Sequence, residues 1–144
     1  MEKIKVLFDT NIILDWLLKR EDFFQNSFEC IQLCNKEIIE GYITPHSISD
    51  IFYLISKKYS GTEKKEYINL LCNLFYILSE DSTVLKKIIT SENWKDDIWN
   101  DIEYSMQIVA AEVGNLDYIL TRNIKDFRNT KIKCISPENL LQRI

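Results

Sequence analysis

The sequence predicts a three-layer α/β/α domain with a mainly parallel central sheet. Two observations lead to this prediction: short apolar runs, such as residues 4–8 and 117–121, and longer segments between them whose apolar residues recur at helical spacing. Strands that alternate with helices are typical of a parallel sheet covered on both faces. Because the chain has 144 residues, of which 46% are hydrophobic, we expect one domain over residues 1–144.

The first half of the chain contains both patterns together with clear helix boundaries. Gly41 follows a long helical pattern that it should end, and Thr44-Pro45 is typical of a helix start, with Thr44 as the cap and Pro45 in the first turn. The elements expected here are a strand over 4–8, helices over 11–19 and 23–38, a strand over 42–43, and helices over 45–59 and 62–73.

The second half continues the alternation of strands and helices. Asp81-Ser82 is typical of a helix start, and Ser136-Pro137 predicts the cap of a last helical turn. Between these signals, the segment 98–113 carries apolar residues on one helical face. The elements expected here are a strand over 75–78, helices over 82–90 and 98–113, strands over 117–121 and 132–135, and the last turn after 136.

The composition limits the classes of protein to consider. No apolar run approaches the roughly 18–20 residues of a membrane span, and the N-terminus lacks the regions of a signal peptide, so we expect a cytoplasmic protein without membrane contact. The four cysteines form no CxxC pair or Cys/His cluster, which argues against zinc. The net charge of −4 argues mildly against a nucleic-acid partner, although carboxylates that bind a divalent cation would account for part of it.

Polar side chains follow two of the predicted strands. Asp9 and Asn11 come directly after the first strand, and Thr121 and Asn123 come after the fourth, with Asp126 just beyond. Ligands bind at the carboxyl ends of strands in open α/β sheets. Carboxylates gathered there repel one another unless a hard cation lies between them, so the sequence predicts a Mg²⁺ or Mn²⁺ site. The alternatives are Asp9 as a helix N-cap and Asp126 as an ordinary turn residue.

These motifs resemble those of the PIN-domain family. Its members are small α/β metal-dependent ribonucleases, and many of them, the VapC-like proteins, are the toxins of bacterial toxin–antitoxin pairs. The segment 41–53 resembles the family's second motif, in which an acid lies early in a helix, and 136–140 resembles its usual end. The resemblance covers nearly the whole chain, most weakly between 60 and 95, and implies a PIN-like fold.

The resemblance also implies a role for each matching residue. The expected catalytic residues are Asp9, Asp50, Asp101 and Asp126. Three polar residues are expected to orient the site through hydrogen bonds: Asn11, Thr121 and Asn123. Asp9 would be a direct or water-bridged metal ligand, and Asp126, or Asn123 beside it, matches the last acidic position. Asp50 matches the second acid; the alternative is a surface residue, because its helical angle is nearly opposite to that of its apolar neighbours.

One position departs from the family's pattern. Tyr104 occupies the place where the family has its third acid. Asp101, three residues earlier on the same helical stripe, could substitute, and it is expected with Asp9 and Asp126 as a metal ligand. Glu103 projects about 160° away from Asp101, at 100° per residue, and is a poorer candidate unless the helix begins after it.

The sequence therefore predicts a Mg²⁺- or Mn²⁺-dependent endoribonuclease that cleaves RNA with a metal-activated water. The resemblance implies RNA as substrate, a cognate antitoxin as partner, and a homodimer. Arg122 and Lys125 are candidate phosphate contacts, with solvated turn residues as the equal alternative. His46 is expected to be structural or exposed, with a substrate contact as the less favoured alternative. The competing hypothesis is a degenerate PIN-like domain that binds RNA or a protein without cleavage, which Tyr104 favours.

Overall fold

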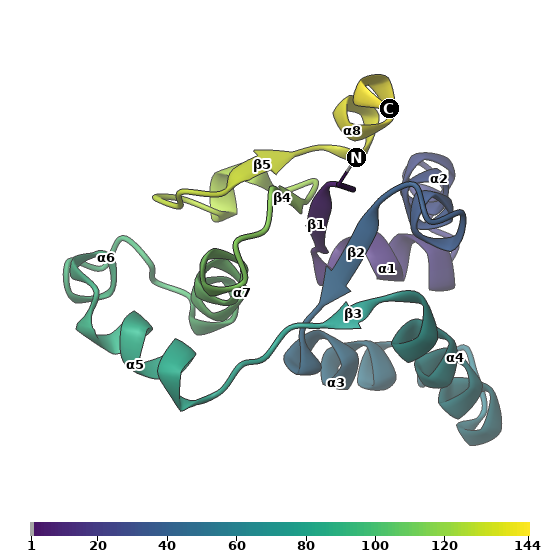
Figure 1. Ribbon diagram of the computed structural model, residues 1–144. Coiled ribbons are helices and arrows are strands. Elements are labelled where there is room, and N and C mark those ends of the chain that lie inside the picture. The colour runs from purple at the N-terminus through teal and green to yellow at the C-terminus, as the bar shows by residue number, and fades with distance from the viewer. Residues whose placement is uncertain (1) are drawn as a thin grey trace.

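The sheet is built from five short strands. The computed structural model describes residues 2–144, so only Met1 of the expected domain lies outside the described residues. The strands are β1 (Lys5–Phe8), β2 (Glu40–Ile43), β3 (Tyr76–Ile77), β4 (Tyr118–Leu120) and β5 (Lys133–Ile135). They form one five-stranded sheet in the order β3-β2-β1-β4-β5, and every neighbouring pair is parallel (Figure 1). The predicted α/β class with a parallel sheet is confirmed.

Strand β1 lies in the middle of the sheet, where the direction of winding reverses. From β1 the chain adds β2 and β3 on one side, and later β4 and β5 on the other. Such a reversal opens a crevice at the carboxyl ends of the strands, where α/β proteins bind ligands. Phe8 pairs with Leu120 across β1 and β4, so Asp9 and Thr121, which follow these strands, are neighbours at that edge.

Helices cover both faces of the sheet. They are α1 (Thr10–Leu17), α2 (Phe24–Asn35), α3 (Pro45–Leu54), α4 (Gly61–Leu74), α5 (Ser82–Thr90), α6 (Glu92–Lys95), α7 (Ile102–Val113) and α8 (Pro137–Arg143), with a 3₁₀ turn, η1 (Ile124–Asp126). Figure 1 shows α5, α6 and α7 together on the side away from α1 and α2. Among residues 2–144, no helix combines the length and the apolar character needed to cross a membrane.

The two faces of β1 bury its side chains in two separate cores. Val6 and Phe8 lie in one core with residues of α1, α2, α3, α4 and α8. Leu7 lies in the other core with residues of α5 and α7. Because successive strand residues point to opposite faces, an unbroken apolar run such as that of β1 is the pattern expected of a strand covered on both sides.

Helix α7 begins four residues later than the sequence predicted. The Asp101 carboxylate accepts hydrogen bonds from the backbone N–H groups of Glu103, at 2.8 Å, and Tyr104, at 3.2 Å, and so caps the helix. The prediction was wrong because Ile98 and Trp99 continue the apolar pattern while lying outside the helix, and both pack into the second core. This shift changes which side chains of α7 face the carboxyl edge of the sheet.

The other boundaries show which local signals were sufficient. Thr44 caps α3 as predicted, because its hydroxyl accepts the backbone N–H of Ser47 at 3.2 Å. The short helix α6 was not predicted; Ser91 caps it by accepting the N–H of Asn93 at 3.1 Å. The helices expected over 11–19, 23–38 and 45–59 end two to five residues earlier, as is usual for boundaries inferred from periodicity.

Candidate metal centre

A small cleft of about 130 Å³ lies at the carboxyl end of β1. Its lining comes from three separate parts of the chain: the β1–α1 junction, α3 and the first turns of α7. The lining residues are Asp9, Thr10, Asn11, Leu14, Asp50, Leu54, Glu103, Tyr104 and Gln107. Two of the four expected acids, Asp9 and Asp50, thus share one cleft with a third acid, Glu103, which was predicted to be a poorer candidate.

The side chain of Asp9 turns to the neighbouring strand end rather than to the start of α1. It occupies the N-cap position of α1, yet its side chain makes no capping hydrogen bond. Instead, its Oδ2 accepts a hydrogen bond of 2.8 Å from the hydroxyl of Thr121, and the residue is only 2% exposed. Burial raises the pKa of Asp9 to about 6, against the opposing effects of the Thr121 hydrogen bond and the charge of Arg122. The alternative of an ordinary helix cap does not match this geometry.

The strand end that follows β4 supports this carboxylate. Thr121 is fully buried, and its hydroxyl oxygen accepts the backbone N–H of Asn123 at 2.9 Å while donating to Asp9. Asn123 therefore contributes through its main chain. Asn11 lines the cleft, and its side-chain oxygen accepts a hydrogen bond of 3.0 Å from Arg20.

The N-terminal turns of α3 are anchored at the same edge. The hydroxyls of Thr10 and Ser47 lie 2.7 Å apart in a hydrogen bond that joins the start of α1 to α3. The backbone N–H of His46 donates to Oε1 of Glu80 at 2.9 Å. Glu80, which follows β3, is half-buried, and burial raises the pKa of its carboxyl group. These contacts fix the position from which α3 presents His46 and Asp50.

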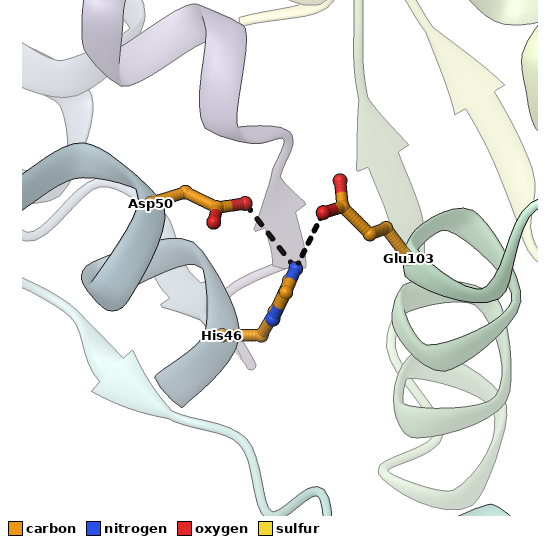
Figure 2. Close-up of side chains that lie close together, drawn as sticks. All are labelled: His46, Asp50 and Glu103. Carbon is orange, nitrogen blue, oxygen red and sulfur yellow. Dashed lines mark ion pairs between the residues drawn. The ribbon is translucent and has the colours of Figure 1, made fainter. Parts of the chain in front are cut away.

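His46 and Asp50 lie one helical turn apart and face Glu103 across the cleft (Figure 2). The Nε2 atom of His46 is 3.2 Å from Oδ2 of Asp50 and 3.0 Å from Oε1 of Glu103. Burial lowers the pKa of His46, but the neighbouring carboxylates outweigh this effect and raise it. Burial raises the pKa of Asp50, with the imidazole opposing the shift and the Glu103 charge adding to it. His46, expected to be structural or exposed, thus lies near three acids: Asp50, Glu103 and Glu80.

Asp101 and Asp126 lie outside this cleft. Asp101 is exposed and caps α7, and Asp126 is exposed in the turn η1. Both line a separate space of only about 10 Å³, which they share with Tyr104. The structure therefore does not gather all four expected acids into one pocket. Because α7 starts at Ile102, it is Glu103 rather than Asp101 that reaches the cleft.

Tyr104 lines both of these spaces. Its ring packs edge-on against Phe127, with the ring centroids 4.9 Å apart. Burial, followed by the charges of Asp9 and Asp126, raises the pKa of the Tyr104 phenol to about 12. The phenol is consequently neutral at physiological pH and cannot replace the negative charge of a carboxylate ligand.

Arg122 forms an ion pair with Asp15, a buried acid that was not predicted to have a role. Its Nε and one terminal nitrogen each donate to a different oxygen of Asp15 at 2.9 Å, and its guanidinium lies 3.8 Å from the centre of the Phe23 ring. Asp15 is fully buried and also accepts the hydroxyl of Ser27 at 2.8 Å. The second candidate phosphate contact, Lys125, is exposed.

Gln107 was also missed. It is 3% exposed and lines the cleft, and its Oε1 is buried without a hydrogen-bond partner among residues 2–144. A spacing signal existed, because Gln107 follows Glu103 by four residues and side chains four apart lie on one helical face. His46 and Asp50 have the same spacing in α3. The Glu103–Gln107 pair was missed because the start of α7 was predicted too early, whereas the His46–Asp50 pair was overlooked in a helix whose start was predicted correctly.

A family model described as the PIN domain matches residues 5–125. The chain belongs to the PIN-domain family. No curated protein matches the sequence significantly.

Several solved structures share this fold. VapBC from Salmonella typhimurium bound to DNA superposes with a TM-score of 0.71 at 14% identity, covering 93% of this chain and 98% of that chain. VapBC2 from Rickettsia felis bound to a promoter DNA fragment gives 0.68 at 16% identity, covering 92% and 98%. FitAB bound to the IR36 DNA fragment gives 0.69 at 15% identity, covering 92% and 94%. At these identities the likeness demonstrates the fold alone.

The donor groups of the cleft fit a divalent cation, as is typical of PIN domains. Three carboxylates, from Asp9, Asp50 and Glu103, and the unpartnered amide oxygen of Gln107 all line it. Oxygen ligands of these kinds are those that Mg²⁺ and Mn²⁺ prefer. Burial is the main cause of the raised pKa values of Asp9 and Asp50, so the charged form of each carboxylate is disfavoured in the cleft. A cation in the cleft would favour that charged form.

Proposed function

We propose that this PIN domain is a Mg²⁺- or Mn²⁺-dependent endoribonuclease that cleaves RNA phosphodiester bonds with water. The proposal is carried by the buried carboxylate of Asp9, which stands at the start of α1 without capping it and is held in the cleft by Thr121. Burial opposes the charge of this group, so packing alone does not account for an acid here. A strongly perturbed carboxyl group in a cleft is instead typical of a functional site.

In this proposal, Asp9, Asp50 and Glu103 hold the ion. Glu103 takes the part that the sequence analysis gave to Asp101, because the carboxylate of Asp101 is bonded to the first turn of α7. Asp126 stays outside the ligand set, since it lines a different space. The hydroxyl of Thr121 keeps Asp9 in one orientation by donating to Oδ2.

The reaction needs a nucleophile and charge neutralisation at the phosphate. A bound divalent ion supplies both, by lowering the pKa of a water and by stabilising charge on the scissile group. The protein holds the three carboxylates in position and restricts which side chains are available to accept a proton. Nε2 of His46 faces two carboxylates and is therefore not a free general base. Two nitrogens of the Arg122 guanidinium donate hydrogen bonds to Asp15. We therefore assign Arg122 a structural role and not a phosphate contact.

We also propose that the protein is a toxin that acts in the cytoplasm as a homodimer and is bound by a cognate antitoxin. A solved toxin–antitoxin complex from Klebsiella pneumoniae, which shares the fold with a TM-score of 0.65 at 16% identity, supports this role. The surface beside the cleft supports it too: Leu54 lines the cleft and is 55% exposed, and the adjacent Tyr53 is 76% exposed. Exposed apolar side chains next to a site are typical of a protein-binding surface. Co-purification with the product of an adjacent gene, and inhibition by it, would test this role.

The nuclease proposal is tested with metal-free protein and a mixed-sequence single-stranded RNA. We expect cleavage with Mn²⁺ or Mg²⁺ and none with EDTA. Asp9→Asn and Glu103→Gln should each lower the rate by roughly 100-fold or more, because each removes a charged ligand. Asp101→Asn is the matched control: it also removes one carboxylate, but asparagine caps a helix as well as aspartate does.

The outcomes separate the residue assignment from the function. Loss of activity in Asp101→Asn, with activity retained in Glu103→Gln, would show that the ligand assignment is wrong while leaving the nuclease intact. Cleavage that is unaffected by EDTA, or that survives Asp9→Asn, would refute the metal-dependent mechanism.

A second candidate function rests on Tyr104. A neutral phenol at the position of the family's third acid is the feature expected of a PIN-like domain that binds RNA or a protein without cutting. Tight RNA binding without cleavage at millimolar Mn²⁺ would favour this candidate.

A further inference from the structure

We propose that Nε2 of His46 is itself a metal ligand, together with Asp50 and Glu103, and that this nitrogen makes the cleft select a first-row transition-metal ion over Mg²⁺. The inference deepens the proposed nuclease site and rests on that site binding a divalent ion. It concerns two residues of this chain, His46 and Glu103, that the motif comparison left without a role.

The first support is the arrangement of the donor atoms. One ligand atom from each of His46, Asp50 and Glu103 lies within 4.8 Å of the other two. The nitrogen is 3.2 Å and 3.0 Å from the two carboxylate oxygens. Two ligands at right angles, each about 2.1 Å from an ion, are separated by about 3 Å. The spacing therefore suits adjacent positions around one ion without moving α3 or α7.

The second support is a buried polar atom with unused bonding capacity. Oε1 of Gln107, on a residue that is 3% exposed, lacks a hydrogen-bond partner among the described residues and lines the same cleft as Asp50 and Glu103. Buried polar atoms left unsatisfied are rare and usually indicate a ligand or water. Figure 2 shows Nε2 of His46 pointing between the carboxylates of Asp50 and Glu103.

The third support is the way α3 is held. Thr44 caps this helix, and Glu80 accepts the backbone N–H of His46 at 2.9 Å. The hydroxyl pair of Thr10 and Ser47 ties the same turn to the start of α1. A ligand that is positioned by such surrounding contacts loses little conformational freedom when it binds an ion, which raises its affinity.

The chemical consequence is selectivity. Mg²⁺ prefers oxygen ligands and keeps much of its water, whereas imidazole nitrogen suits transition metals. A site of one imidazole and two carboxylates thus favours ions such as Mn²⁺ over Mg²⁺, while an all-carboxylate site would discriminate less. In the alternative arrangement, the protonated imidazole of His46 takes the place of the metal ion between Asp50 and Glu103. The two roles predict opposite effects when the imidazole is removed.

The test uses a favourable property of the sequence: His46 is the only histidine in the chain. Protein labelled with ¹⁵N-histidine, without a histidine tag, reports on this one residue. Pulsed electron paramagnetic resonance of the Mn²⁺-loaded protein should show ¹⁵N coupling from a bound imidazole. Calorimetry with Mn²⁺ and with Mg²⁺ should show that His46→Gln lowers the Mn²⁺ affinity roughly tenfold or more and the Mg²⁺ affinity much less. Asp101→Asn serves as the folded control with unchanged affinities.

Absence of ¹⁵N coupling, or a Mn²⁺ affinity in His46→Gln equal to or above that of the wild type, would overturn the inference. A rise in affinity would identify the imidazole as the substitute cation. In either case, cleavage of RNA that still depends on the ion and on Asp9 would leave the proposed nuclease standing. No binding of Mn²⁺ or Mg²⁺ to the wild type at millimolar concentration would overturn both.

Discussion

Replacing Asp9 by Asn should stabilise the metal-free protein at neutral pH while it removes metal binding. The pKa of Asp9 is raised by burial from 3.8 to about 6 in the folded protein. One pKa unit corresponds to about 1.36 kcal/mol, so charging Asp9 in the fold costs about 3 kcal/mol relative to the unfolded chain. Asparagine carries no charge, and its side-chain oxygen can still accept the hydrogen bond from Thr121.

The direction of the pH dependence follows from the raised pKa. Between about pH 4 and pH 6 the folded state binds more protons than the unfolded state at this group, so the contribution of Asp9 to stability falls as the pH rises through that window. The full cost is present above about pH 6 and absent below about pH 4. Asp9→Asn should therefore gain up to about 3 kcal/mol at pH 7.5 and almost nothing at pH 4.

The assay is thermal unfolding in EDTA at both pH values. Each kcal/mol moves the Tm of a domain of this size by roughly 2–4 °C, so the expected rise at pH 7.5 is about 6–12 °C. With Mn²⁺ at 1,000 times its Kd the order should reverse, because the ion then stabilises only the wild type, by about 4.1 kcal/mol, which exceeds the gain of about 3 kcal/mol from the substitution. Asp101→Asn, in which an exposed cap is exchanged for an equivalent one, should show neither effect. If Asp9→Asn were equally destabilised at both pH values, burial of the Asp9 charge could not be what costs stability in the wild type.

Three further predictions concern the neighbours of this carboxylate. Asp15→Ala should destabilise the fold by about 3 kcal/mol in urea unfolding, because it leaves the charge of Arg122 unpaired; a loss below about 1 kcal/mol would contradict the structural role of the pair. Tyr104→Asp should raise Mn²⁺ affinity several-fold in calorimetry and lower metal-free stability, because it adds a carboxylate beside Asp9; unchanged affinity would show that the position no longer reaches the ion. Gln107→Leu should stabilise the metal-free protein by about 1 kcal/mol, because an unsatisfied buried oxygen is removed, and should slow metal-dependent RNA cleavage; a loss of stability would indicate that Oε1 has a partner such as water.

The fold was predictable because its signals are local. The apolar run of β1 predicted a strand buried on both faces, and Thr44-Pro45 predicted the start of α3. Periodicity failed where a side chain joins the core from outside a helix. Trp99 is buried in the second core and its ring N–H donates to the carbonyl oxygen of Arg128 at 2.8 Å, so it extends the apolar pattern of α7 without belonging to that helix.

The site was only partly predictable, because it depends on where α7 begins. A helix starting at residue 98 places Asp101 on the stripe of Tyr104 and turns Glu103 away, whereas a helix starting at Ile102 makes Asp101 the cap and brings Glu103 into the cleft. Moving the start of α7 by four residues thus replaces Asp101 by Glu103 as the candidate ligand. Asp9 and Thr121 were located correctly because their position depends on strand ends and not on helical phase.

The arrangement of charges around Asp9 supports the proposal that the cleft binds a divalent cation. The charge of Arg122 lowers the pKa of Asp9, but two nitrogens of this side chain are bonded to the fully buried Asp15, which Arg20 also approaches to 3.4 Å. Despite Arg122, the pKa of Asp9 is still raised. His46, the other group able to carry positive charge there, faces Asp50 and Glu103 rather than Asp9. Asp9 thus keeps a raised pKa despite the hydroxyl donor of Thr121, and a divalent ion beside it would offset the cost of its buried charge at neutral pH.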